Sequence, residues 1–349
     1  STGSTSGKVL MFVSFKGQTI MKTVNMTSSG VFVLEEGTYN RDFKSGSFTV
    51  VFHSDMFEES DYTIEIPSNA SSWLSNVQTR ATTRYEETMA VTVNDTGNPR
   101  SAIVQIVKSD NGQNVGEFIV SQTSATNLSA SDLANCYIIK SNGAYMFNTY
   151  KGTDGRTLFD GITDRNVEWQ TNGALITPYD GSPDGKVMFE VDNWSQGNAL
   201  LSVSGSNGIM WSWHLWMVND LGTNSLGSYV MMDRNLGATS KTDEGAYYQY
   251  GRKDPFIAGK FSVSTSRPAT GEDAAATPDV FYYSNTENVT GWAMSSETSW
   301  DSSSKSVTDP CPPGYMIPST SVWDGVTLEC NNINNANFSG ATYPVSGSI

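Results

Sequence analysis

The most regular alternation of apolar and polar positions in this chain falls on residues 208–217, which read GIMWSWHLWM. The odd positions from Ile209 to Met217 are all large and apolar, whereas the even positions include Ser212 and His214. A period of two is the pattern of a β-strand with one face in a core. Three of the nine tryptophans lie in this segment, and each buries roughly 150 to 250 Å² when it enters a core. We therefore predict that a core is built around this strand.

Shorter alternating segments precede it. Two of them, residues 9–15 and Gly30–Leu34, predict strands separated by polar turn residues. The sequence leaves open whether these strands form a small unit of their own or join the sandwich that follows. Five more strands, separated by turns, are predicted at residues 46–52, 62–66, 89–93, 101–107 and 116–122. This spacing is typical of an immunoglobulin-like β-sandwich. Within it we expect Trp73 to fill the core, and not to form an exposed platform for a sugar, because aromatic side chains are mostly buried.

A hinge rich in Ser, Thr and Asn at residues 125–130 predicts a domain boundary. After it, strands are predicted at residues 134–139, 143–147, 167–170, 175–177 and 186–191. The acidic, glycine-rich stretches 152–155 and 180–185 are interpreted as ordinary turns. A calcium loop would need several carboxylates at alternating positions, and residues 180–185 contain only two.

The alternation of apolar and polar residues becomes weaker toward the C-terminus. Tyr229–Met232 predicts a strand, and residues 247–252 follow an Ala/Gly stretch that predicts the start of a helix. Residues 260–308 are poor in apolar pattern and contain the isolated Trp292 and Trp300. A loop of this length is usually functional or mobile. Two interpretations remain open, a second binding region and a solvated loop.

Composition narrows the class of protein. A chain of 349 residues suggests two or three domains, and 16% charged residues with 31 glycines is typical of extracellular β-rich proteins. The net charge of -15, without any cluster of Lys or Arg, argues against binding to nucleic acid or to an anionic membrane surface. No apolar run of 18 residues predicts a membrane span. Residues 1–7 lack the features of a signal peptide, so we expect any such signal to have been removed.

The chain is poor in residues that bind metals or form disulfides. It has three cysteines, Cys136, Cys311 and Cys330, and two histidines, His53 and His214. These are too few for a disulfide framework or a multi-histidine zinc site, so we expect no metal and no cofactor. The one disulfide bond that we consider would join Cys311 to Cys330.

Catalytic motifs are also missing from the sequence. It contains no Gly-x-Ser-x-Gly elbow, no HExxH and no P-loop, and no two of its 36 acidic residues stand out as a glycosidase pair. We therefore expect no catalytic residues and a protein that is not an enzyme.

Binding is better supported by the residue types near the tryptophan strand. Sugar recognition combines aromatic faces with carboxylate, amide and arginine groups. The candidate ligand-binding residues are His214, Trp216, Asp233, Arg234, Asn235, Tyr250, Arg252, Asp254, Trp292 and Trp300. A second interpretation is that residues 233–235 form a buried network and that Arg252 pairs with Asp254, since buried polar groups must be satisfied.

Several of these segments resemble known bacterial modules. Residues 62–67 with 72–75, 94–103 and 119–123 resemble the BACON domain, a module of Bacteroidetes named as carbohydrate-associated. A role as a spacer is equally compatible with such a small sandwich. Residues 196–204, 208–216, 231–239 and 245–256 resemble a module common in surface proteins of gut Bacteroidetes. Residues 309–318, DPCPPGYMIP, resemble the CPxGYxxP signature of the Fibrobacter-type major paralogous domain, which is similar to C-type-lectin-like and formylglycine-generating-enzyme-like folds.

The resemblance implies a cell-surface or fimbrillin-associated lipoprotein. It also implies a lectin-like domain whose closing strands lie outside this sequence or are donated by another pilus subunit. The EPN or QPD and WND triplets of calcium-dependent lectins are absent, as is the cysteine pair of the formylglycine-generating enzymes.

Together these observations predict a mainly β, multidomain protein, with immunoglobulin-like β-sandwiches followed by a partial lectin-like α+β domain. The expected division is a tether with two strands at 1–40, a BACON-like sandwich at 41–125, a second β unit at 126–205 and a lectin-like domain at 206–349. The expected function is adhesion or glycan capture at the extracellular cell surface, with glycans or a mucin surface as partners. Contact with a membrane is expected only through a lipid anchor absent from this chain. The alternative is a structural pilus-tip or stalk component that binds other pilus subunits by strand exchange.

Overall fold

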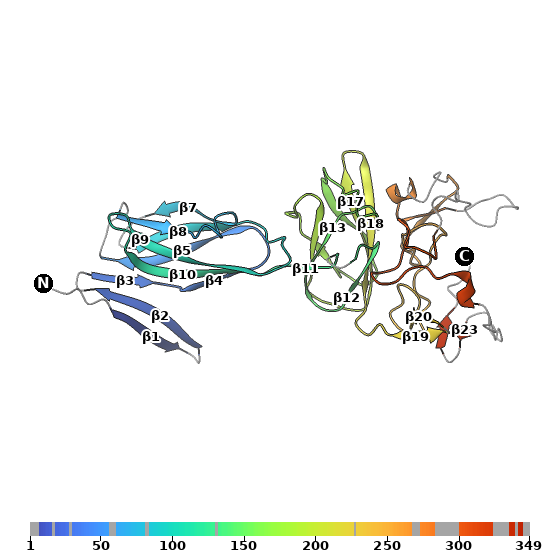
Figure 1. Ribbon diagram of the computed structural model, residues 1–349, viewed down its shortest axis with the longest axis horizontal. Helices are drawn as coiled ribbons and strands as arrows, with labels where there is room; N and C mark the ends of the chain where they lie inside the picture. Colours follow the sequence, from blue (N-terminus) through green and yellow to red (C-terminus); the bar gives the residue numbers. More distant parts are fainter. Residues whose placement is uncertain are drawn as a thin grey trace. The chain divides into compact units, whose positions relative to one another are not determined.

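The computed structural model describes residues 7–15, 18–27, 30–55, 61–80, 84–129, 132–226, 228–266, 273–282, 300–323, 335–338 and 341–344. The chain divides into two compact units, Ser1–Ala125 and Thr126–Ile349, within the stretch expected to be a hinge. Both units are built from β-strands (Figure 1). The protein is therefore mainly β and multidomain, as the sequence predicts. None of the helices in the described ranges has the length and hydrophobicity that crossing a bilayer requires.

The first unit is a sandwich of two sheets. One sheet has the strand order β1-β2-β3-β5-β8-β7 and the other β4-β10-β9-β6. The strands of the first sheet are β1 (Gly7–Phe15), β2 (Gln18–Thr27), β3 (Gly30–Leu34), β5 (Gly46–Ser54), β8 (Arg84–Val91) and β7 (Leu74–Arg80). Those of the second are β4 (Thr38–Arg41), β10 (Asn114–Gln122), β9 (Arg100–Lys108) and β6 (Tyr62–Glu65).

The N-terminal strands belong to this sandwich. The segment expected to be a polar turn contains β2, which pairs with β1 along its length, and β3 pairs with β5. Of the two arrangements that the sequence leaves open, these strands therefore join the sandwich, and no domain boundary falls at residue 40. The alternation in β2 is interrupted at Met21 and Lys22, and pairing with its neighbours decides its structure.

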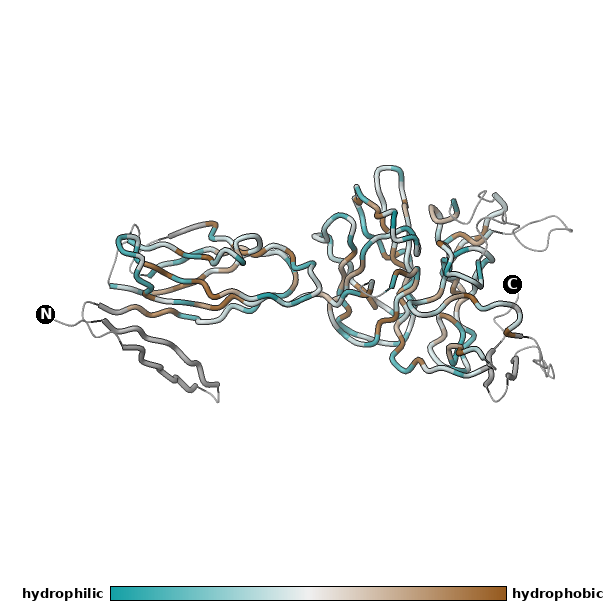
Figure 2. Tube along the Cα trace, in the orientation of Figure 1, coloured by the Kyte–Doolittle hydropathy of each residue, from teal (hydrophilic) through white to brown (hydrophobic). Residues whose placement is uncertain are grey.

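The core between the two sheets is rich in aromatic residues. Phe52 stacks on Tyr85 with ring centroids 5.1 Å apart, and Trp73 is only 6% exposed. The guanidinium of Arg100 lies 4.7 Å from the centroid of the Trp73 ring. Trp73 therefore fills the core, as predicted, and offers no platform to a sugar. Figure 2 shows the hydrophobic stretches along the strands of this unit.

The second unit begins with another sandwich. Its sheets have the orders β11-β13-β16-β15 and β12-β18-β17-β14. The first contains β11 (Thr126–Asn127), β13 (Gly143–Asn148), β16 (Lys186–Val191) and β15 (Thr177–Pro178). The second contains β12 (Cys136–Ile139), β18 (Gly208–Met217), β17 (Gly197–Gly205) and β14 (Asp164–Gln170).

The tryptophan strand, β18, lies inside this sandwich. It pairs with β17 from Gly197 opposite Met217 to Gly205 opposite Gly208, and its other edge pairs with β12. The boundary expected between residues 205 and 206 is therefore wrong, because two hydrogen-bonded strands of one sheet lie on either side of it. Trp211, Trp213 and Leu215 enter the core between the two sheets.

The residues after β18 form little regular structure. They include three two-stranded ribbons and two short 3-10 turns, but no α-helix among the described residues. The helix expected at residues 247–252 is absent, and Tyr247 instead forms an isolated bridge with Phe256. The ribbons pair β19 (Thr223–Leu226) with β20 (Tyr229–Met232), β21 (Ser262–Ser264) with β22 (Val280–Tyr282), and β23 (Asn335–Phe338) with β24 (Ala341–Pro344). The turns are η2 (Asp273–Ala276) and η4 (Thr320–Trp323).

Candidate functional site

The second face of β18 is covered by the segment that follows it. From Trp211 to Met217 every residue of this strand is buried. The even-numbered side chains of Ser212, His214 and Trp216 point away from the sandwich core, and each hydrogen-bonds outside it. The strand therefore has one face in the sandwich core, as predicted, and its second face is buried as well. The second face carries polar groups, and they are buried because later loops supply their partners.

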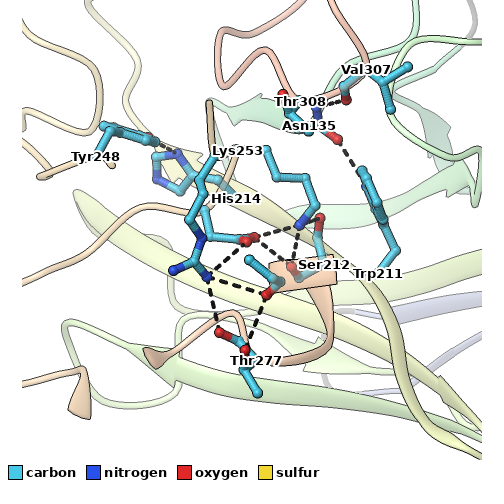
Figure 3. A network of polar contacts seen from close by, with 12 residues as sticks. Asn135, Trp211, Ser212, His214, Tyr248, Lys253, Thr277, Val307 and Thr308 are labelled. Carbon is cyan, nitrogen blue, oxygen red and sulfur yellow. Dashed lines mark hydrogen bonds and ion pairs between the residues drawn. The ribbon is translucent and has the colours of Figure 1, made fainter. Parts of the chain in front are cut away.

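His214 is the centre of a chain of hydrogen bonds on this face, and Figure 3 shows its contact with Tyr248. Its Nε2 lies 2.8 Å from Oδ1 of Asn198, whose Nδ2 donates to the carbonyl oxygen of Gly237. That carbonyl can only accept, so it orients the Asn198 amide and assigns the ring proton to Nε2. Nδ1 is then an acceptor, and the hydroxyl of Tyr248, 3.3 Å away, donates to it. Burial lowers the pKa of His214 to about 3, so the ring is neutral.

Lys253 and Asp254 form a buried ion pair against the same face. Lys253 Nζ lies 2.5 Å from Oδ1 of Asp254 and 4.5 Å from the centroid of the Trp211 ring. Both charged side chains are 2% exposed. Burial lowers the pKa of Lys253, against the attraction of Asp254. The pair is compensated by hydrogen bonds to Ser212, as a buried pair must be.

This arrangement contains a serine next to a lysine and an aspartate, but the serine is closed off from a substrate. Ser212 Oγ donates to Asp254 at 2.6 Å and accepts from Lys253 at 2.5 Å. The Asp254 carboxylate is thus placed where a general base would be. Ser212 is, however, 0% exposed, so a substrate does not reach it.

The two arginines predicted to bind a ligand are both structural. Arg252 is fully buried and donates to the backbone carbonyls of Val280 and Thr277. All five N–H donors of Arg234 are used. They bond to both carboxylate oxygens of Asp233, to a side-chain oxygen and the backbone carbonyl of Asp220, and to the carbonyl of Thr239. The hydrogen bond to Asp233 raises the pKa of Arg234 against the effect of burial.

The DPCPPGYMIP segment is held by side chains that bond its backbone. Lys305 Nζ donates to the carbonyl oxygens of Cys311, Pro312 and Tyr315 at 2.7 to 2.8 Å. The buried Asp309 carboxylate accepts from the backbone N–H groups of Cys311 and Ile317.

Asn135 ties this segment to the sandwich. Its amide nitrogen donates to the carbonyls of Val307 and Asp309, and its oxygen accepts from the indole N–H of Trp211, as Figure 3 shows in part. The loop is irregular in shape but has most of its polar groups satisfied.

A pocket of about 640 Å³ lies beside this loop. Its walls are the strand β20, Tyr248, Trp300 and the residues between Pro310 and Ser319. Among the described residues that line it, most are apolar or aromatic and Arg234 is the only charged one. Its size is in the range of small-molecule sites, which are commonly apolar with few polar groups.

The predicted site residues are only partly brought together. His214, Trp216, Asp233, Arg234, Arg252 and Asp254 are buried, which supports the interpretation of a structural network. Trp216 donates to the carbonyl of Ala238 and offers no face to a ligand. Arg234, Asn235 and Trp300 line the pocket, and Tyr250 is 56% exposed with its ring 5.6 Å from that of Trp300. Trp292 lies outside the described residues.

Sequence reasoning missed most of the pocket. Its remaining aromatic walls come from Tyr229, Tyr248 and Tyr315, and three methionines line it, Met231, Met232 and Met316. Two features of the sequence belong to the walls of this pocket, namely the strand predicted at Tyr229–Met232 and the proline-rich motif at residues 309–318. Neither predicts that the two segments face each other.

Two smaller predictions concern metals and cysteines. The stretch 180–185 forms a turn in which Asp184 accepts from the backbone N–H groups of Gly161 and Ile162. No group of three potential metal ligands occurs in the part of the chain that the structure describes.

Cys136 and Cys311 are free, buried thiols whose pKa values burial raises. Cys330 lies outside the described residues.

No family model and no curated protein matches the sequence. Among matching solved structures, a Bacteroides ovatus GH5 xyloglucanase in complex with a XXXG heptasaccharide has 17% identity and a TM-score of 0.22, over 29% of this chain and 20% of that one. An endo-fucoidan hydrolase of glycoside hydrolase family 107 has 10% identity and a TM-score of 0.24, over 62% and 38% of the two chains. The Escherichia coli adhesin FdeC has 12% identity and a TM-score of 0.23, over 62% and 75%.

These matches contradict one expectation and leave the others open. Two of the similar structures are glycoside hydrolases, so the expectation that this chain is not an enzyme is not retained. The chain spans 20% and 38% of those hydrolases, and TM-scores this low assign no activity. The resemblance to Bacteroidetes surface modules stays a prediction.

Proposed function

We propose that the protein is an extracellular, cell-surface protein that captures glycans in the pocket of its second unit. The observation that carries this proposal is a pocket of about 640 Å³ with four aromatic residues in its walls. Sugars bind to proteins by stacking their C–H faces on aromatic rings, and a pocket of this size holds one or two sugar rings.

The aromatic walls have the rigidity that recognition needs. Trp300 is oriented by the hydrogen bond from its indole N–H to the carbonyl of Thr308, and Tyr248 by its bond to His214. Tyr315 belongs to the loop that Lys305 holds. Fixing these rings before the ligand arrives lowers the entropy lost on binding.

The sequence adds independent support. The segment resembling the Fibrobacter-type signature forms one wall of the pocket, and the first unit resembles a carbohydrate-associated module. The low share of charged residues and the many Ser, Thr and Gly residues are those of extracellular β-rich proteins. On this proposal the partners are glycans of a host or mucin surface.

The test is a glycan array probed with the wild-type chain and with Tyr229→Ala and Tyr315→Ala. Both substitutions remove pocket walls, so we expect binding of the recognised glycan to fall at least ten-fold. Tyr179→Ala is the matched control, because Tyr179 is a half-buried tyrosine of the same unit outside the pocket. Circular dichroism verifies that each variant is folded.

The outcomes are distinct. Binding that is lost in the two pocket variants and kept in the control supports the proposal. A folded wild-type chain that binds no glycan overturns it, and pull-downs with pilus subunits then test strand exchange. Mass analysis of bound oligosaccharides after incubation separates capture from cleavage.

A further inference from the structure

The pocket contains a positive charge that is not available to a ligand. Arg234 is 2% exposed, and its five donors already bond to Asp233, Asp220 and Thr239. Two of these partners are carboxylates, so the charge of Arg234 is compensated within the protein. The chain as a whole carries a net charge of -15. An acidic sugar would therefore meet no free counter-charge among the described residues of the pocket wall, in a protein that repels it.

Much of the remaining wall is apolar. Met231, Met232, Met316 and Ile317 line the pocket as half-buried side chains. A sugar hydroxyl placed against such a surface loses its hydrogen bonds to water without a replacement. A methyl group placed there gains free energy from burial, and methionine side chains adapt to its shape.

Two polar hydrogens of the pocket wall are also committed. The Tyr248 hydroxyl donates to His214, and the indole N–H of Trp300 donates to Thr308. Neither of these hydrogens is therefore available to a ligand.

We infer that the pocket takes an uncharged sugar that carries a methyl group, either in an acetamido substituent or at C6 of a deoxy sugar. This inference rests on the proposed function and adds the class of glycan. Acidic sugars are excluded because all five donors of Arg234 are already used, and the methionines favour a methyl group.

The experiment uses two pairs of sugars that differ at the relevant group. N-acetylglucosamine is compared with glucose, and L-fucose with L-galactose, by calorimetric titration of the intact chain. Glucuronic acid is the charged comparison. Burying one methyl group is worth about a four-fold gain in affinity, so we expect the methylated member of at least one pair to bind at least about four-fold more tightly. Tighter binding of N-acetylglucosamine than of glucose would indicate an acetamido ligand, and tighter binding of L-fucose than of L-galactose a deoxy sugar.

Met316→Gln keeps the length of the side chain but removes its apolar end. We expect it to abolish the preference for the methylated sugar. Met210→Gln is the matched control, since Met210 is also half-buried but lies in the sandwich and outside the pocket.

Equal affinity within both pairs, tighter binding of glucuronic acid, or a preference that survives Met316→Gln would overturn the inference while leaving glycan capture intact. Absence of binding to every sugar, here and on the array, would instead overturn the proposed function.

Discussion

The hydroxyl of Tyr248 lies 3.3 Å from Nδ1 of His214, so a residue of the pocket wall is bonded to the buried face of the central strand β18. His214 is held in turn by Asn198 on the adjacent strand β17. The pocket is therefore not an isolated surface feature. Its shape depends on polar contacts that also hold the loops against the sheet.

His214 makes the second unit sensitive to acid. Its pKa is about 3 in the folded protein because of burial, and about 6.5 in an unfolded chain. Between these values the unfolded state binds a proton that the folded state does not. The stability contributed by the neutral ring is fully present above pH 6.5 and is lost as the pH falls from 6.5 toward 3.

We expect this one group to lower the free energy of unfolding by on the order of 3 kcal/mol between pH 7 and pH 4. In His214→Gln that part of the pH dependence should disappear, although the variant is less stable at pH 7. Urea unfolding followed by tryptophan fluorescence measures it, since all tryptophans except Trp73 lie in the second unit. His53→Gln, at the 45% exposed histidine of the first unit, is the control. An unchanged pH dependence in His214→Gln would show that the ring is not buried as described.

Breaking the buried Lys253–Asp254 pair should be strongly destabilising. Lys253→Met leaves Asp254 with Ser212 and with Arg252 at 3.6 Å, and we expect a loss of about 3 to 5 kcal/mol in the free energy of unfolding. The double variant with Asp254→Leu should lose less than the sum of the two single variants, because no uncompensated charge remains. Chemical denaturation of all three measures the coupling. Lys260→Met, at an exposed lysine, should change stability by less than about 0.5 kcal/mol. Additive effects in the double variant would contradict a direct interaction.

Removing the ammonium group of Lys305 should open the loop that forms one pocket wall. Lys305→Met leaves the carbonyls of Cys311, Pro312 and Tyr315 without this donor, and we expect a loss of about 2 to 4 kcal/mol. Cys311 is only 4% exposed, so its alkylation by iodoacetamide, located by peptide mass spectrometry, reports the opening. The labelling rate should rise in Lys305→Met and stay at the wild-type value in Lys140→Met. If both variants label at the same rate, Lys305 does not hold the loop.

Gly152 and Gly161 differ in what surrounds them. Both have a positive φ, +55° and +65°, so alanine at either position should cost about 1 to 2 kcal/mol in backbone strain. A Cβ on Gly152 would overlap the carbonyl of Val307, whereas a Cβ on Gly161 would meet nothing within 4 Å. We therefore expect Gly152→Ala to lower the midpoint of thermal unfolding by clearly more than Gly161→Ala. Equal shifts would mean that the turn and the Val307 segment do not pack closely.

Much of the fold could be predicted because strand patterns are local. The alternation in residues 46–52 and 101–107, for example, marks β5 and β9, since one face of each packs in the core of the first unit. The strand β2 was not predicted because Met21 and Lys22 interrupt the alternation of its apolar residues Ile20, Val24 and Met26 with polar ones. The helix expected at residues 247–252 failed because Arg252 and its neighbours form long-range contacts that override a weak local preference.

The site was less predictable for a related reason. Arg234 and Arg252 have the chemistry of ligand-binding residues, and only their partners show that they are structural. Those partners include residues far along the chain, such as Thr277 for Arg252. A sequence contains the donors and acceptors but not their pairing.

By itself, the sequence determined the mainly β class, the position of the division between the two units, and the strand β18 as the centre of a core. These follow from local periodicity and composition, which need no knowledge of distant contacts. Only the tertiary structure decided that the second face of β18 is buried and that the pocket lies between β20 and the loop at residues 310–319. Burial of polar groups depends on partners supplied from other segments, and a pocket exists only where distant segments meet.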